Sequence, residues 1–276
     1  MLKKLVFAAA LSLAAYVPAH AAIVTIPQSA LISSTNYYTD TIGGGIGNIV
    51  VTTDGGNEPN IGNPSGRNDD GFSGPVNLGF SLTFFGQTYT SLYINNNGNV
   101  SFGSGISTFT PQGPTGVNAP IISPFFGDVD TRGANSGVVH VRTDIANEII
   151  VTWDNVGYFD SHDTALNSFQ LVLRGSAFDI PVGEGAIGFF YKGMNWERGD
   201  VSSVSAAVGF GDGAGNGNIL EGSTQTGLIS ALEDHHIWFD PRLNPIPDPN
   251  ETPEPGSLAL AGLAIAGLAR MRRRRG

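Results

Sequence analysis

The chain has 276 residues and a formal net charge of −10, with 14 lysines and arginines against 24 aspartates and glutamates. Residues 22–255 are more acidic still, with seven basic side chains against all 24 acidic ones, so this part repels nucleic acid and anionic lipid. The sequence has no cysteine, which excludes disulfides, cysteine nucleophiles and cysteine-ligated zinc. We therefore expect no nucleic-acid partner, and one large domain held by its own core.

The first 21 residues have the pattern of a secretory signal. Two lysines precede an apolar run over residues 5–15, and Ala19-His20-Ala21 is the small-x-small pattern that signal peptidase accepts. The run is too short for a permanent membrane span. We expect a signal helix over residues 1–21 that signal peptidase cleaves after Ala21 or nearby, with Ala19 and Ala21 as its recognition residues.

The body of the chain consists of short runs in which apolar and polar residues alternate, separated by turn residues. Period 2 with one apolar face indicates strands of a sheet that is packed on one side. We therefore expect an all-β fold, an antiparallel β-sandwich-like single domain, in which Trp153, Phe169, Trp196 and Phe210 supply core area. The expected strands lie over residues 78–84, 139–142, 149–153, 169–174 and 187–192.

A hairpin is predicted where Asn97-Gly98 separates two alternating runs. This dipeptide suits the positive φ values of a type I′ turn. The three asparagines 95–97 offer an alternative, because their side-chain oxygens suit a metal ion or a sugar. The apolar residues of the flanking strands are Leu92, Ile94, Val100 and Phe102.

Six sequence blocks in a fixed order resemble the NIDO domain, a nidogen-like extracellular domain. The blocks are FFGQTYTSLYINNNGNVSFG, APIISPFFGDVDTRGANSGVVHVR, VTWDNVGYF, NSFQLVLRG, GFFYKGMNW and AAVGFGDG, followed by LEGS. The resemblance covers about residues 80–239, with residues 22–79 as an N-terminal β extension. It implies an extracellular, all-β, non-catalytic module associated with cell-matrix adhesion, and it names no ligand.

Asp128 and Asp130 are the best candidates for a metal site. Carboxylates that alternate at the end of a strand point to the same side, and Asn135 follows shortly after. Ca²⁺ prefers such oxygen ligands and is the one cofactor that we consider. In the alternative interpretation, the two aspartates cap turns or pair with Arg132.

Two histidine-containing stretches are candidates for a catalytic site. Asp234-His235-His236 precedes an expected closing strand and lacks the further aspartate and histidine clusters of a metal phosphoesterase. His162-Asp163 is expected in a polar loop, and the sequence has no Gly-x-Ser-x-Gly nucleophile elbow. We therefore expect no catalytic residues.

Residues 209–223 partly match an EF-hand loop. Asp212 and Asn216 occupy ligand positions, but Ser223 stands where the loop needs glutamate, and no flanking helices are expected. We interpret the stretch as a long glycine-rich loop, with cation binding as the alternative.

The C-terminal segment combines a spacer, a short apolar run and a basic end. The proline-rich spacer at residues 240–252 is expected to be extended rather than packed. Residues 256–269 are expected to form a membrane helix of about 21 Å, shorter than the hydrocarbon core of about 30 Å. A cluster of arginines would hold its end on the cytoplasmic side: Arg270, Arg272, Arg273, Arg274 and Arg275.

Residues 253–276 resemble the PEP-CTERM sorting signal of Gram-negative bacteria that make exopolysaccharide. The resemblance is carried by Pro253-Glu254-Pro255, the short apolar helix and the arginine cluster, in that order. It implies that an exosortase, a membrane transpeptidase-like enzyme, cleaves near the Pro-Glu-Pro motif. The inner membrane would then hold the protein only transiently.

The sequence as a whole predicts an exported, non-catalytic cell-surface or biofilm-matrix protein. Its expected partner is an extracellular polysaccharide or a matrix or surface protein. One alternative is an exopolysaccharide-binding module in which Tyr158 or Phe159 stacks on sugars. Another is a secreted hydrolase, for which no particular pair of carboxylates stands out.

Overall fold

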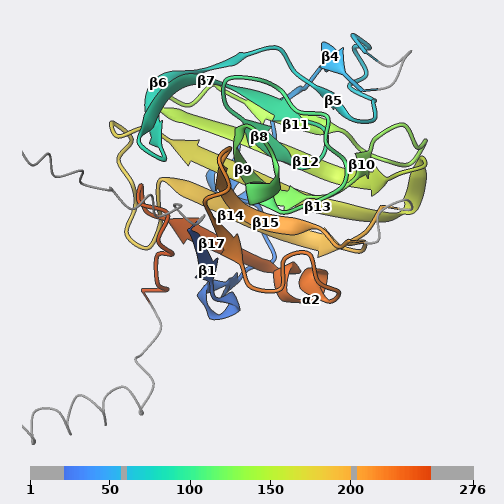
Figure 1. Cartoon of the computed structure of the whole chain (residues 1–276). Helices are drawn as coiled ribbons and strands as arrows, with labels where there is room; N and C mark the ends of the chain where they lie inside the picture. Colours follow the sequence, from blue (N-terminus) through green and yellow to red (C-terminus); the bar gives the residue numbers. More distant parts are fainter. Residues whose placement is uncertain (1–21, 57–60, 200–203, 250–276) are drawn as a thin grey trace, which may run out of the picture.

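The computed structural model describes residues 22–56, 61–199 and 204–249. In these residues the chain forms two β-sheets, of nine and eight strands, with a few short helices (Figure 1). The nine-stranded sheet has the order β1-β16-β15-β9-β8-β7-β5-β4, and β6 pairs with β7. Its strands are β1 (Ile23–Ile26), β4 (Asp54–Gly55), β5 (Gly71–Phe72), β6 (Val76–Phe84), β7 (Gln87–Asn95), β8 (Asn99–Ser101), β9 (Pro120–Phe126), β15 (Ala207–Asp212) and β16 (Gly217–Leu220).

The eight-stranded sheet has the order β2-β17-β14-β13-β12-β11-β3, and β10 pairs with β12. Its strands are β2 (Ile32–Ser33), β3 (Asn48–Ile49), β10 (Val129–Asp130), β11 (Val139–Arg142), β12 (Glu148–Tyr158), β13 (His162–Arg174), β14 (Ile187–Met194) and β17 (His235–Phe239). The helices are α1 (Tyr38–Ile42), α2 (Leu228–Leu232) and 3₁₀ turns at Gln28–Ala30 and Pro114–Gly116. The five expected strands are confirmed as β6, β11, β12, β13 and β14.

The core lies between the sheets and contains the aromatic residues that the sequence predicted. Trp153 on β12 stacks on Phe169 of β13 with ring centroids 5.1 Å apart, and Phe210 on β15 reaches across to Phe189 on β14 at 5.4 Å. All four side chains are fully buried. Because burying one large apolar side chain stabilises the fold by about 1.5–3 kcal/mol, this core can replace the missing disulfides.

Two features depart from an antiparallel sandwich with one apolar face per sheet. β1 pairs with β16 in parallel. The outer face of the eight-stranded sheet is also buried, because Ile150 and Val172 pack with Tyr38 of α1. The run Ile149-Ile150-Val151 reflects this double burial, since a strand covered on both faces is continuously apolar.

A buried ion pair lies on the covered face. The Arg174 side chain is 0% exposed and contacts Glu148 Oε2 at 2.8 Å and Glu184 Oε2 at 2.5 Å. Its guanidinium carbon lies 4.3 Å from the ring centroid of Trp238. Removing one partner of such a pair leaves an uncompensated charge, so this position couples β12 and β13 strongly.

The loop between β7 and β8 is the predicted hairpin with a different turn. Asn95 pairs with Asn99, which leaves a three-residue loop, and Gly98 has a φ of 75° while Asn97 has no positive φ. A type I′ turn needs positive φ at both central residues, so that prediction is wrong. The three-residue loop instead needs only one left-handed residue, and Gly98 supplies it.

Residues 240–249 pack on the domain, which corrects the expectation of an extended spacer. Leu243 is 6% exposed and belongs to the core, and the Ile246 amide donates to the Trp238 carbonyl at 2.7 Å. The Asp240 carboxylate accepts the Asn244 amide at 2.9 Å, which closes the turn. Pro241 lies in this turn, and Pro245 forms a β-bridge with Phe239.

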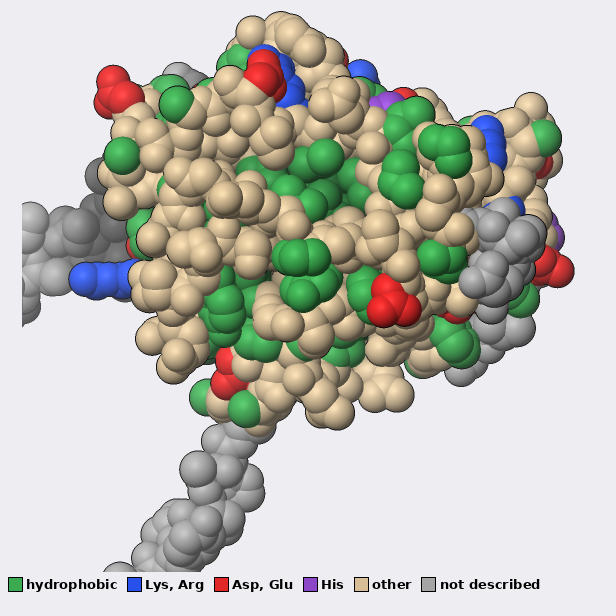
Figure 2. All heavy atoms as spheres, turned by 90° about the horizontal axis from the view of Figure 1, so that it is seen from above, with side chains coloured by type: hydrophobic (Ala, Val, Ile, Leu, Met, Phe, Trp, Pro, Cys, Tyr) green, Lys and Arg blue, Asp and Glu red, His purple; other side chains and the backbone are tan. Residues whose placement is uncertain are grey.

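No helix within the described ranges is long and apolar enough to cross a membrane. The expected signal helix and C-terminal membrane helix lie outside these ranges. The face drawn in Figure 2 is mostly uncharged, with hydrophobic side chains visible in a hollow near its middle. Charged side chains are scattered over this face rather than gathered into a patch of one sign.

Candidate functional site

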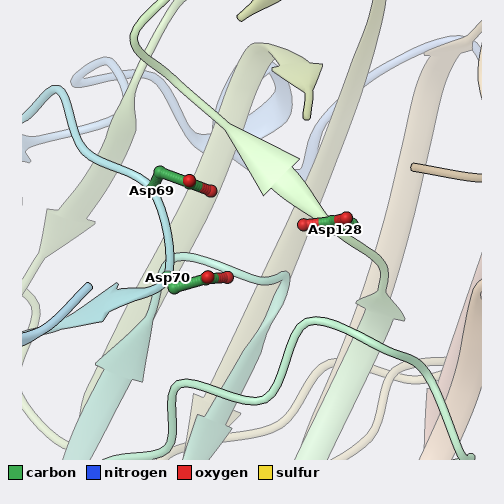
Figure 3. A group of neighbouring side chains, drawn as sticks. All are labelled: Asp69, Asp70 and Asp128. Carbon is green, nitrogen blue, oxygen red and sulfur yellow. The ribbon is translucent and has the colours of Figure 1, made fainter. Parts of the chain in front are cut away.

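Three aspartates from two separate parts of the chain meet beside the nine-stranded sheet. Asp69 and Asp70 directly precede β5, and Asp128 lies between β9 and β10. One oxygen of each carboxylate lies within 4.8 Å of the others, and Figure 3 shows Asp128 pointing toward the other two. An isolated bridge between Asp69 and Asp130 holds the two segments together. We call Asp69, Asp70 and Asp128 the acidic cluster.

One arginine beside the cluster is bound by a fourth carboxylate. Arg132 donates from Nε to Asp130 Oδ1 at 2.9 Å and from Nη2 to Asp130 Oδ2 at 2.6 Å. Its Nη2 also lies 2.9 Å from Asp69 Oδ2. Asp130 further accepts the Ser161 amide at 2.8 Å. Asp130 is therefore occupied by donors, whereas Asp70 and Asp128 have no salt bridge among the described residues.

Burial and mutual repulsion raise the pKa of two cluster carboxyls. Burial raises the pKa of Asp128 to about 7, and the negative charges of Asp70, Asp69 and Asp130 contribute to this rise, against the opposing effect of Arg132. Burial also raises the pKa of Asp70, although a hydrogen bond from Asn97 opposes this. The protein alone thus disfavours full ionisation of the cluster.

The hairpin loop places two buried asparagines against the cluster. Asn97 Nδ2 donates to Asp70 Oδ1 at 2.7 Å, and Asn96 Nδ2 donates to the carbonyls of Asn68 and Val129. Both residues are 1% exposed, and the Oδ1 atom of each has no hydrogen-bond partner among the described residues. Trp153 Nε1 donates to the Asn96 carbonyl at 3.1 Å, which anchors this loop to the core.

A polar groove of about 720 Å³ is a second candidate site. Residues of β12, β13 and β14 line it together with Tyr37, which caps α1. The Tyr37 hydroxyl donates to Asp154 Oδ1 at 3.3 Å. Lys192 also lines the groove, and its Nζ lies 3.0 Å from Asp40 Oδ2. The hydroxyl, amide and charged groups of the groove suit a hydroxyl-rich ligand better than an apolar one.

A family model described as NIDO related matches residues 50–244, which is more than half of the chain. The chain belongs to the NIDO-related family. The model for the PEP-CTERM protein-sorting motif matches residues 251–275. The NIDO-related domain and this motif together indicate an exported surface protein, and the motif implies recognition by an exosortase.

The curated relatives of the chain include alpha-tectorins and a nidogen. Alpha-tectorin of Gallus gallus is 30% identical over 170 residues, covering 52% of this chain and 8% of that protein. Alpha-tectorin of Mus musculus is 29% identical over 206 residues, covering 61% and 9%. Nidogen of Drosophila melanogaster is 28% identical over 190 residues, covering 53% and 14%. The chain thus spans a small part of each relative, and no solved structure gives a significant match.

In the NIDO-related domain, the two predicted metal residues have different partners. Asp128 joins Asp69 and Asp70, while Asp130 is held by Arg132, in agreement with the alternative interpretation. Asn135 is exposed, and its amide donates to Asp163 Oδ2 at 2.7 Å. Sequence reasoning missed Asp69 and Asp70, for which the adjacent carboxylates in Asn-Asp-Asp-Gly, residues 68–71, were the available signal.

The histidines of the two candidate catalytic stretches have structural partners in the NIDO-related domain. His162 begins β13 rather than lying in a loop, and its Nδ1 is 3.1 Å from the Phe159 carbonyl. His236 lies in β17, the expected closing strand, and stacks on Phe190 with centroids 5.2 Å apart. His235 Nδ1 is 2.6 Å from the Glu233 carbonyl.

Residues 209–223 contain a β-hairpin of β15 and β16 rather than forming a long loop. Asp212 Oδ1 accepts the amides of Ala214 at 2.7 Å and Asn216 at 2.9 Å, and Asp212 Oδ2 accepts Asn216 Nδ2 at 2.6 Å. Burial tends to raise the pKa of Asp212, but these donors together outweigh it and lower the pKa. The carboxylate therefore closes the turn.

The aromatic residues expected to stack on sugars are partly covered. Tyr158 stacks on His162 with centroids 4.7 Å apart and contacts Trp196 at 5.4 Å. Arg132 lies 6.0 Å from the ring centroid of Phe159. Tyr158 and Phe159 are both half-buried, so they make a poor open platform.

The predicted processing residues lie outside the described ranges. They are Ala19 and Ala21 at the signal cleavage site, Pro253, Glu254 and Pro255 in the sorting motif, and Arg270, Arg272, Arg273, Arg274 and Arg275 in the basic cluster.

Proposed function

We propose that the protein is a non-catalytic adhesion module of a Gram-negative bacterium that an exosortase sorts to the cell surface or biofilm matrix. Signal peptidase removes residues 1–21, the arginine cluster retains the precursor in the inner membrane, and cleavage near Pro253-Glu254-Pro255 releases the body. The domain then contacts an extracellular polysaccharide or a matrix or surface protein. Ca²⁺ is the one cofactor that we consider for the domain.

One observation carries the proposal: the sorting motif follows the NIDO-related domain almost directly, at residues 251–275 and 50–244. Since Leu243 is still part of the core, only a few residues separate the packed domain from the motif. This arrangement would hold the folded body close to the outer face of the inner membrane until cleavage.

The test is sorting of a tagged body in a host that carries an exosortase. Replacing Pro253, Glu254 and Pro255 together by alanine should leave a full-length precursor in the inner membrane. Deleting residues 270–276 should instead let the uncleaved precursor pass into the periplasm, because its membrane retention is lost.

A matched control exists upstream, where Pro247-Asp248-Pro249 has the same pattern as the motif with aspartate in place of glutamate. Its triple alanine variant should be cleaved and released like the parent protein. Equal release of the motif variant and this control would refute the sorting proposal.

The polar groove supports an exopolysaccharide-binding module as the second candidate function. It is large enough for a sugar unit and is lined by hydroxyl and amide groups. A glycan array with the parent protein and Lys192→Ala tests this. Retention of one glycan class by the parent and its loss in the variant would support this candidate function. If the parent retained no glycan, the result would favour adhesion to a protein instead.

A further inference from the structure

The acidic cluster holds more negative charge than its basic neighbours balance. Arg132 forms ion pairs beside the cluster and is shared by Asp69, Asp130 and Asp160. The nearby Arg67 donates to backbone carbonyls, including that of Thr131 at 2.7 Å. Buried carboxylates without a matching cation are costly unless they are paired or coordinate a metal.

Two buried oxygens at the cluster also lack hydrogen-bond donors. Asp128 is 2% exposed and Asn97 is 1% exposed, and neither Asp128 Oδ2 nor Asn97 Oδ1 has a hydrogen-bond partner in the part of the chain that the structure describes. The Asn97 amide lies directly against the cluster, because its Nδ2 donates to Asp70. Figure 3 shows one oxygen of the Asp128 carboxylate on the side of Asp69 and Asp70. A buried carboxylate oxygen without a donor, beside two further carboxylates, leaves room in the bonding pattern for a positive ion.

We propose that Asp69, Asp70 and Asp128 bind one Ca²⁺ ion. Ca²⁺ binds oxygen ligands at about 2.3–2.6 Å, so two ligands on opposite sides lie roughly 4.6–5.2 Å apart. Carboxylate oxygens within 4.8 Å of one another therefore fit a single ion. Mg²⁺ requires shorter bonds in a strict octahedron and retains its waters, which a mostly buried site disfavours.

The ion would join segments that are distant in the sequence. Residues 69–70 lead into β5, and residue 128 links β9 to β10. Binding would therefore tie the segment before β5 to the link between the two sheets at residue 128. Because the ion would bind only the folded protein, it would stabilise the native state. This inference does not depend on how the protein is sorted.

Thermal unfolding and terbium luminescence of the exported protein test the site. After treatment with EDTA, Ca²⁺ added through the range of roughly 10⁻⁴–10⁻³ M typical of extracellular sites should raise the Tm. Excitation of the tryptophans should sensitise bound Tb³⁺, since Trp196 packs against Gly127 beside Asp128. Ca²⁺ should displace Tb³⁺ with one ion per chain.

Asp128→Asn distinguishes a metal ligand from a structural carboxylate. In EDTA the variant should be at least as stable as the parent, because it removes repulsion among buried charges. In Ca²⁺ it should lose most of the Tm gain, with an affinity at least about tenfold weaker. Asp179→Asn makes the same charge change at an exposed position and should bind Ca²⁺ like the parent.

Three results would overturn the proposal. The first is equal Tm values in EDTA and Ca²⁺ for the parent. The second is Ca²⁺ affinity unchanged in both Asp128→Asn and the less buried Asp70→Asn. The third is an equal Tm gain with Mg²⁺. If Asp128→Asn fails to fold, Asp70→Asn alone must lose the Ca²⁺ response for the proposal to stand.

Discussion

Gly98 in the β7–β8 loop gives a quantitative test of the fold. Its φ of 75° costs a residue with a side chain about 1–2 kcal/mol. A Cβ atom there would also overlap the Phe125 carbonyl oxygen and lie 3.2 Å from Phe169 Cζ. The backbone cannot easily withdraw, because the Phe125 amide donates to the Gly98 carbonyl at 3.2 Å. Such overpacking adds about 1–3 kcal/mol, so Gly98→Ala should lower the free energy of unfolding by about 2–5 kcal/mol.

Gly103→Ala is the matched control. Gly103 has a φ of 83°, but a Cβ atom added there would have no heavy atom within 4 Å beyond its chain neighbours. The variant should therefore lose only the backbone cost of about 1–2 kcal/mol. Urea unfolding followed by tryptophan fluorescence measures both losses, provided that the m-value stays constant. Equal losses for the two variants would refute the close contact between the loop and β9.

Three further variants test the packing. Arg174→Met should lower the free energy of unfolding by about 3–5 kcal/mol in urea titrations, because Glu148 is left buried and unpaired; a loss below about 1 kcal/mol, as at a surface pair, would contradict this. Leu243→Ala should cost about 2–5 kcal/mol if residues 240–249 belong to the core, and a free spacer would show no change. Burial lowers the pKa of His236, so the folded state binds its proton less readily than the unfolded state, and the contribution of His236 to stability should fall as pH drops below about 6.5. His236→Gln should remove this contribution while Asp248, Glu184 and His235 stay around the site, and a pH profile of stability equal to that of the parent would contradict the assignment to His236.

The sequence predicted the strands because their pattern is local. Alternation at Leu78, Leu82 and Phe84 reports one buried face without knowledge of what covers it. The cover of the second face was not predictable, because it depends on Tyr38 packing against Ile150 across a large separation in sequence. The turn prediction is wrong for a related reason, since the cross-strand register and not the Asn-Gly pair fixes its length.

The candidate site was predictable only in part, because its residues also come from distant parts of the sequence. Asp128 was visible as a carboxylate at a strand end, but its partners come from the segment before β5. The bridge between Asp69 and Asp130 brings that segment to β10. Long-range strand pairing leaves no periodic signal in the sequence, so Asp69 and Asp70 could not be linked to Asp128 without the fold.

The mass of the mature protein purified from its native cells tests the central claim most directly. Sorting by an exosortase predicts a chain that begins at or near Ala22 and lacks residues 270–276, recovered from the surface or matrix fraction. A mature chain that retains the arginine cluster and remains in the inner membrane would contradict the account and make the protein a permanently tail-anchored one.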